Sequence, residues 1–174
     1  MTTTVLDETG IKRAITRMAH EIIEASQGAG DLALIGIQTR GVFLAQRLCD
    51  AIFDIEGVRL PCGEMDINLY RDDWTRISHQ PVVKPTEIPF EVENRRILLV
   101  DDVLYTGRTI RAAMDALMDF GRPAAINLAV LVDRGHREFP IQADFVGKKV
   151  ETDYGQHIHV LMKEHDGEDG VTLS

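Results

Sequence analysis

Two adjacent carboxylates, Asp101 and Asp102, stand at the end of an apolar run, Ile97–Val100, and a turn with threonine and glycine, Thr106–Thr109, follows closely. An aliphatic run that ends in turn residues is typical of a buried parallel strand leading into a helix. The first backbone N–H groups of a helix are unpaired and carry partial positive charge, so this turn is suited to binding a phosphate. Because carboxylates repel phosphate, we expect the two acids to accept hydrogen bonds from sugar hydroxyls. The segment therefore predicts a site for a phosphorylated ribose.

Three other interpretations compete with a phosphoribose site. The two acids could simply cap the next helix, since motif matches alone are fallible. A bacterial receiver domain also has two acids after an apolar strand, but that pair opens the domain, and in this chain of 174 residues only 72 follow Asp102. A P-loop needs Gly-Lys-Ser/Thr, whereas Gly107 is followed by Arg108 and Thr109. The phosphoribose interpretation is therefore preferred.

The chain is predicted to form one domain, residues 1–174, with a hydrophobic core of its own. A composition of 44% hydrophobic and 27% charged residues excludes a disordered chain. No apolar run approaches the roughly 20 residues of a membrane span, and the N-terminus lacks the features of a secretory signal. Cys49 and Cys62 show no metal-ligand spacing, so we expect reduced thiols in a cytoplasmic protein without membrane contact.

The formal net charge of −9 argues against bulk, charge-driven binding of nucleic acid, which usually needs a basic face. The charge leaves room for a local basic patch, which a phosphorylated sugar or an RNA would require. The global charge thus does not decide between these partners.

Apolar periodicity predicts helices that alternate with strands. Helices are expected from Glu8 to about Gln27, through Leu44–Ile52, and after the 106–109 turn to about Phe120. Strands are expected at Leu32–Ile37, Met65–Tyr70, Ile97–Val100, Ile126–Val132, Ala143–Val146 and His157–Met162, followed by a polar tail. Residues 71–90 have no clear period, which is typical of a functional or mobile segment. The alternation predicts an α/β fold, a mainly parallel sheet with helices on both faces.

Three polar turns follow predicted strands, namely Thr39-Arg40-Gly41, residues 101–109 and residues 133–137. In a parallel α/β sheet, ligands bind beyond the carboxyl ends of the strands. The three turns are therefore predicted to converge on one edge and form one site. The glycine at position 41 is expected to let the backbone approach a ligand.

Four segments carry a family resemblance. Residues 97–109 resemble the phosphoribosyl-pyrophosphate (PRPP) motif of type I phosphoribosyltransferases. Together with Ile37–Gly41, Leu69–Asp73 and Leu131–Glu138, they resemble the pyrimidine operon attenuator/uracil phosphoribosyltransferase (PyrR) family over about residues 5–165. The resemblance implies the type I phosphoribosyltransferase fold, in which a small hood accompanies the sheet.

The resemblance implies two activities. One is transfer of phosphoribose from PRPP to uracil, which gives UMP and pyrophosphate. The other is binding of the pyrimidine operon mRNA leader when a uridine nucleotide, UMP or UTP, is bound, which promotes early termination of transcription. A homodimer or higher homo-oligomer is also implied. The residues themselves leave open transfer to another base, an enzyme without RNA binding, and a regulator that only senses nucleotides.

By this resemblance, Thr39, Arg40 and Gly41 belong to the loop that binds the pyrophosphate of PRPP, and Asp101 and Asp102 bind its ribose. Arg40 and the two acids are thus the candidate catalytic residues. The residues that correspond to the cradle of the 5-phosphate are Thr106, Gly107, Arg108 and Thr109.

The remaining site residues are also implied by the resemblance. Asp133 and Arg137 lie where the family recognises the base. Residues 71 to about 84, beginning with Arg71, Asp72 and Asp73, correspond to the flexible loop that closes over PRPP. Closure of such a loop excludes water from a reactive ribosyl centre.

The implied reaction needs no protein nucleophile, because positioning and cationic contacts can drive departure of pyrophosphate. Mg²⁺ is the implied cofactor, held mainly through PRPP, since this ion keeps waters and binds through substrate phosphates. We therefore predict no dedicated metal site made of protein ligands. His136, beside two arginines, is expected to be structural.

On the first predicted helix, Thr16, Arg17 and His20 fall within about 100° of one another, opposite the apolar stripe. Periodicity alone favours a solvated polar face. The RNA-contacting helix of the family carries Thr, Arg and His at matching places, so the resemblance implies that these residues contact RNA. Two further positions where it implies arginine hold Ala25 and Gln142.

Overall fold

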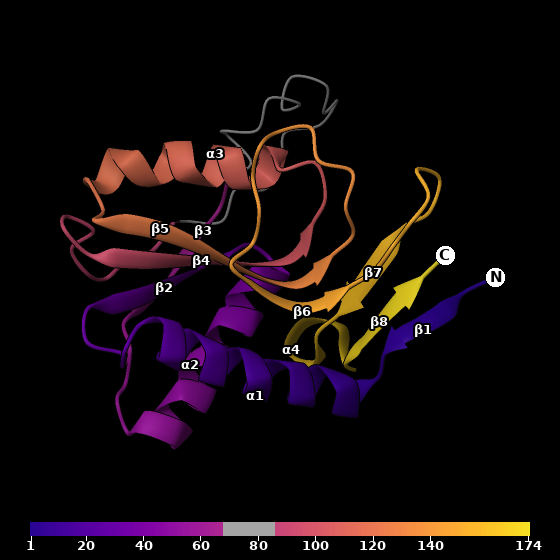
Figure 1. Cartoon of the computed structure of the whole chain (residues 1–174), viewed down its shortest axis with the longest axis horizontal. Coiled ribbons are helices and arrows are strands. Elements are labelled where there is room, and N and C mark those ends of the chain that lie inside the picture. Colours follow the sequence, from indigo (N-terminus) through magenta and orange to yellow (C-terminus); the bar gives the residue numbers. More distant parts are fainter. Residues whose placement is uncertain (68–85) are drawn as a thin grey trace.

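Five parallel strands form the central sheet of the protein, and the computed structural model describes it within residues 1–67 and 86–174 (Figure 1). The strand order across the sheet is β3-β2-β4-β5-β6, and every neighbouring pair is parallel. The strands are β2 (Leu32–Ile37), β3 (Cys62–Met65), β4 (Arg96–Leu104), β5 (Ala125–Asp133) and β6 (Phe145–Lys149). The predicted α/β class with a parallel sheet is confirmed.

Helices cover both faces of this sheet, as predicted. The helices α1 (Glu8–Ala25) and α2 (Arg40–Glu56) lie on one face, and α3 (Arg108–Leu117), extended by a 3₁₀ turn to Phe120, lies on the other (Figure 1). Alternate strand residues feed two cores: Leu34 and Leu98 pack with α1 and α2, whereas Ile35 and Leu99 pack with α3. No helix within the described ranges has both the length and the apolar content needed to cross a membrane.

A second, antiparallel sheet is formed by the two ends of the chain. Its order is β1-β8-β7, with β1 at Thr3–Leu6, β7 at Ile158–Leu161 and β8 at Gly170–Leu173. A short helix, α4 (Lys163–Asp166), joins β7 to β8. The expected polar tail is therefore wrong: Val171 is fully buried, and β8 pairs with β1 and β7 on its two sides. A four-residue strand has too few apolar positions to be recognised without its partners.

Two strands lie at other positions than the periodicity predicts. Within the described residues, the strand expected at Met65–Tyr70 runs from Cys62 to Met65, and residues 68–70 lie outside the described part of the chain. The proline and glycine beside Cys62 are typical of a turn, so periodicity does not predict a strand there. The strand expected at Ala143–Val146 runs instead from Phe145 to Lys149, because pairing with β5 stabilises two lysines that periodicity excludes. This second shift places Lys149 at the carboxyl edge of the sheet.

Two glycines allow α2 to pack closely on the sheet. A Cβ atom on Gly36 of β2 would lie 2.5 Å from Val42 Cα and 2.6 Å from the carbonyl oxygen of Gly41. A Cβ atom on Gly41 would lie 2.5 Å from the carbonyl oxygen of Val100 in β4. These are backbone atoms, so a side chain at either position requires the helix to move.

We predict that Gly36→Ala lowers the free energy of unfolding by about 1–3 kcal/mol, since overpacking forces backbone shifts. Denaturant unfolding measures this change. Gly30→Ala is the control, because its Cβ would meet no atom within 4 Å and its φ is not left-handed. We expect the control to change stability by less than about 0.5 kcal/mol, and equal losses in the two variants would contradict the close approach of α2.

Candidate functional site

The three predicted turns follow neighbouring strands of the sheet. Residues 39–41 follow β2, residues 105–107 follow β4, and residues 134–137 follow β5. Hydrogen bonds join two of them: the backbone N–H of Arg134 donates to Leu104 O at 3.1 Å, and that of Glu138 donates to Thr106 O at 2.8 Å. The prediction that these turns share one edge of the sheet is confirmed.

The two acids lie where β4 loses one of its neighbours. Pairing between β2 and β4 ends at Gly36 and Val100, whereas β4 continues beside β5 as far as Leu104 and Asp133. Asp101 and Asp102 are therefore part of the strand rather than of the turn. Their outer side faces the beginning of α2 instead of another strand.

Each acid is fixed by a hydrogen bond to the next backbone amide. Asp101 Oδ1 accepts from Asp102 N at 2.9 Å, and Asp102 Oδ1 accepts from Val103 N at 2.8 Å. Asp101 is buried, and Asp102 is half-buried. No hydrogen bond from the described residues reaches Oδ2 of Asp102, so this oxygen is available to a ligand hydroxyl.

The turn at 39–41 contains a cis peptide bond between Gln38 and Thr39, and α2 begins at Arg40. Gly41 packs against the backbone of Val100 and Asp101. The missing side chain thus lets the helix approach the strand. Contact of this glycine with a ligand stays a prediction.

Arg40 forms a two-pronged ion pair with Asp166 of α4, the short helix between β7 and β8. Its Nε donates to Asp166 Oδ2 at 3.0 Å, and its Nη2 donates to Asp166 Oδ1 at 2.8 Å. The Asp166 carboxylate raises the pKa of the Arg40 guanidinium, and the nearby charge of Asp102 acts in the same direction. Arg40 is thus paired with an acid of α4.

The start of α3 has the properties of an anion site. Its N-cap is Gly107 with φ 93°, no side chain caps it, and its first turn has no acidic residue. The hydroxyl of Thr106 accepts from Arg108 N at 3.2 Å, so one helix-start amide is already satisfied. The other N–H groups of the first turn have no intrahelical partner and favour a bound anion. Arg108 itself pairs with Glu138 at 3.2 Å and lies over the Phe139 ring.

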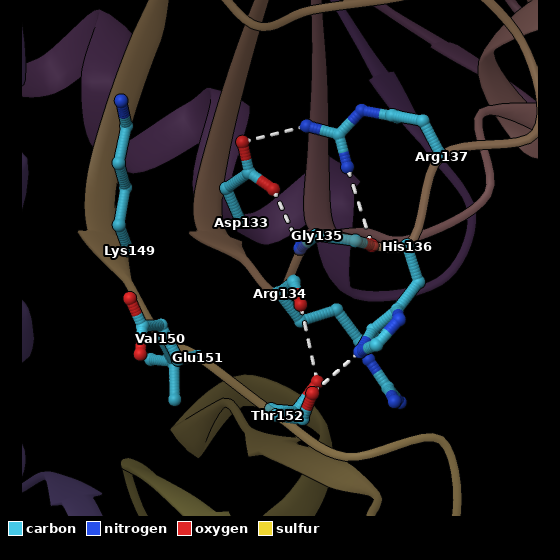
Figure 2. Close-up of a pocket in the computed structure, with 9 residues that line it drawn as sticks. All are labelled: Asp133, Arg134, Gly135, His136, Arg137, Lys149, Val150, Glu151 and Thr152. Carbon is cyan, nitrogen blue, oxygen red and sulfur yellow. Dashed lines mark hydrogen bonds and ion pairs between the residues drawn. The ribbon is translucent and has the colours of Figure 1, made fainter.

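An open pocket of about 710 Å³ lies between the 133–137 turn and the end of β6 (Figure 2). Its other wall is Lys149–Thr152, which no motif had suggested. Gly135 and His136 both have left-handed backbone, with φ of 76° and 62°. Val150 N donates to Asp133 O at 2.9 Å, which ties the two walls together.

Asp133 and Arg137 fix the shape of this turn (Figure 2). Arg137 donates from Nη2 to Asp133 Oδ2 at 2.6 Å, from Nη1 to Tyr105 O at 2.9 Å and from Nε to Ile141 O at 2.7 Å. Asp133 Oδ1 also accepts from Gly135 N at 3.0 Å. Both side chains are thus occupied within the protein, and their contact with a base stays a prediction.

Sequence reasoning missed Arg134 and the pocket wall at residues 149–152, whereas it expected His136 to be structural. Arg134 is 6% exposed and lies over the Tyr105 ring at 4.0 Å, and Thr152 Oγ1 donates to its carbonyl oxygen at 3.1 Å. His136 bonds through Nε2 to Thr152 O and packs on Tyr154, with ring centroids 4.2 Å apart. A strand placed through Lys149 would have brought this second wall to the predicted edge by the same rule that located the other turns.

The residues predicted to contact RNA are exposed on α1. Thr16 donates to Lys12 O at 3.0 Å within the helix. Arg17 donates to Glu21 at 2.7 Å and to the carbonyl oxygens of Val146 and Gly147 in β6, so it also joins α1 to the sheet. The predicted flexible-loop residues Arg71, Asp72 and Asp73 lie outside the described residues.

Comparison with known proteins finds a matching family model and similar relatives. The model of the phosphoribosyl transferase domain matches residues 1–165. The bifunctional protein PyrR of Pelotomaculum thermopropionicum is 57% identical over 169 residues, which cover 97% of this chain and 93% of the relative. The proteins of the same name from Deinococcus deserti and Halalkalibacterium halodurans are 56% and 54% identical, over 98% and 99% of this chain and 93% and 97% of theirs.

Solved structures share the fold. The hypoxanthine phosphoribosyltransferase of Trypanosoma cruzi is 19% identical and superposes with a TM-score of 0.73, covering 98% of this chain and 95% of that protein. The enzyme of the same name from Staphylococcus aureus gives a TM-score of 0.70 at 19% identity, over 98% and 90% of the two chains. At such identity the likeness concerns the fold alone.

We predict that Arg137→Gln lowers the free energy of unfolding by about 2–4 kcal/mol, because it removes the donors to Asp133 Oδ2 and to the carbonyl oxygens of Tyr105 and Ile141. Urea unfolding measures the loss. Asp50→Asn removes the exposed ion pair with Arg59 and is the control, with an expected change below about 0.5 kcal/mol. Equal losses of stability in the two variants would contradict the stabilisation of the 133–137 turn by Arg137.

Proposed function

The chain belongs to the PyrR family of phosphoribosyltransferases, and we propose that it transfers the phosphoribosyl group of PRPP to uracil, releasing pyrophosphate and forming UMP. In this family role it also regulates the pyrimidine operon by binding its mRNA in a manner that depends on uridine nucleotide. One observation carries the enzymatic proposal: an uncapped helix start, an acid pair and an arginine turn lie along one edge of the sheet.

The order of the turns suits an extended substrate. The 5-phosphate would lie at the start of α3, against Thr106–Thr109, and the ribose hydroxyls beside Asp101 and Asp102. The pyrophosphate would lie toward Arg40, and the base would enter the pocket beyond β5 and β6. Binding across three strand ends fixes both the leaving group and the acceptor, which is the main source of rate in such a reaction.

The chemistry requires charge stabilisation more than a nucleophile. The bond between ribose C1 and the pyrophosphate oxygen breaks, and its electron pair leaves with pyrophosphate. Uracil N1 forms the new bond to C1 and loses its proton. Arg40 would stabilise the negative charge that develops on the leaving group, and the two acids would orient the ribose.

Mg²⁺ fits this site as an ion carried mainly by the substrate. Among the described residues, no cluster of three or more His, Cys, Asp or Glu side chains is arranged to hold a metal. Asp101 and Asp102 supply two carboxylates only, which suits an ion that keeps its waters and binds through phosphates. When bound, the ion would neutralise charge on the pyrophosphate.

The regulatory activity is proposed to use the exposed polar face of α1. Thr16, Arg17 and His20 lie on this face, which offers a local site on a chain whose net charge is −9. The partners would be UMP or UTP in the nucleotide site and the pyrimidine operon mRNA leader on α1. We place the protein in the cytoplasm as a homodimer or a higher homo-oligomer.

We predict that the wild-type protein forms UMP from uracil, PRPP and Mg²⁺, and that Asp102→Asn lowers kcat/KM for PRPP about a hundredfold. The amide keeps the shape but loses the charge that orients the ribose. Asp115→Asn on the exposed side of α3 is the control and should not change the rate. Formation of AMP or GMP from purine bases, or full activity of Asp102→Asn, would contradict the proposal.

We predict that pyrimidine leader RNA binds more tightly in the presence of UMP and that His20→Ala weakens this binding about tenfold. Gel shifts measure the affinity, and UMP synthesis should be unchanged in the same variant. His20 is preferable to Arg17, because Arg17 also holds β6. Arg122→Ala removes an exposed cation outside α1 and is the control. If no RNA binds even at low salt, the proposed regulatory role is wrong and only the enzymatic proposal remains.

A further inference from the structure

The first two turns of α2 are held by the segment that connects β7 to β8. Arg40, Phe43 and Arg47 lie three and four residues apart and so share one side of the helix. Arg40 pairs with Asp166 of α4, and Phe43 stacks on His165 with ring centroids 6.3 Å apart. The partners of Arg47 are Glu164 and Asp169, each at 2.7 Å.

The pair between Arg40 and Asp166 uses one edge of the guanidinium. Asp166 accepts from Nε and Nη2, which form the side edge of the planar group. No hydrogen bond within the described part of the chain uses Nη1. The end edge, made by Nη1 and the second N–H of Nη2, can still bind an anion in two-pronged fashion. The ion pair and a phosphate are therefore compatible.

Asp166 is itself rigidly placed. Its Oδ2 accepts from Met162 N at 2.8 Å, at the end of β7, in addition to Arg40 Nε. Its side chain is 13% exposed and that of Arg40 is 30% exposed, so solvent screens this pair only in part. The hydrogen bonds from Arg40 lower the pKa of Asp166 below its ordinary value.

The charge of a second carboxylate acts on the same arginine. Asp102 is close enough for its charge to raise the pKa of Arg40. Direct pairing of these two groups would occupy both a pyrophosphate ligand and a ribose ligand. The hydrogen bonds to Asp166 instead commit the side edge of the Arg40 guanidinium to a carboxylate of α4.

We propose that Asp166 is a positioning residue for pyrophosphate: it orients the Arg40 guanidinium so that its end edge faces the leaving group while Asp102 stays available to the ribose. The proposal rests on the proposed transfer from PRPP. It assigns a role in the reaction to the antiparallel sheet, through a side chain that touches no substrate atom.

The test compares Asp166→Asn with Glu164→Gln. The first variant removes the charge that orients Arg40. The second removes a charge from the same short helix whose partner within the described residues is Arg47. We expect Asp166→Asn to raise KM for PRPP and the inhibition constant of pyrophosphate about tenfold, with KM for uracil changed less than twofold. Glu164→Gln should leave all three constants unchanged, and Asp166→Glu should restore part of the loss.

A double-mutant cycle with Arg40→Gln separates positioning from general stability. If Asp166 acts through Arg40, Asp166→Asn has no further effect on KM for PRPP in the Arg40→Gln background. Circular dichroism and thermal unfolding of each variant check that α4 and the sheet persist. Unchanged PRPP and pyrophosphate constants in Asp166→Asn, equal effects in Glu164→Gln, or additive losses in the cycle would each overturn the proposal. Absence of UMP synthesis in the wild-type protein would instead overturn the proposed function.

Discussion

The site depends on a difference in length between neighbouring parallel strands. β2 stops pairing with β4 at Val100, whereas β4 and β5 run on together to Leu104 and Asp133. The two acids of β4 therefore have a strand on one side and an open flank on the other. The start of α2 fills that flank, and it can do so only because Gly36 and Gly41 let helix and strand backbones touch. Backbone packing thus places the start of α2 beside the strand that carries the acids.

Ion pairs then give the turns their shape. Arg137 fastens the pocket turn to the end of β4, and Arg40 is fastened to the antiparallel sheet through Asp166. Each pair is partly shielded from water, so removal of one partner costs more than loss of a surface salt bridge. In both cases a charged side chain that the sequence predicts to bind a ligand also stabilises the folded protein. Such side chains keep a polar site rigid, and a rigid site loses less conformational entropy when a ligand binds.

The N- and C-terminal segments make contacts with the rest of the fold that their sequences do not predict. Residues of β1 and β8 form one sheet, and α4 lies beside the first turns of α2. On the other side, Arg17 of α1 contacts the carbonyl oxygens of β6, whose following residues line the pocket. The helix proposed to bind RNA and the pocket proposed to bind the base thus belong to one connected body.

Elements with local sequence signals can be predicted without the structure. The stripe of Ile11, Ile15, Met18 and Ile22 predicts α1, the run before Asp101 predicts β4, and turn residues after successive strands predict one shared edge. The groups that meet across that edge follow from the folded arrangement of the strands and cannot be predicted from the segments one by one. The partner of Arg40 is 126 residues away, the second pocket wall follows a strand that pairing extends to Lys149, and β8 is recognisable only beside its neighbours. These contacts depend on strand order and register, which are properties of the whole sheet and leave no periodic trace in any one segment.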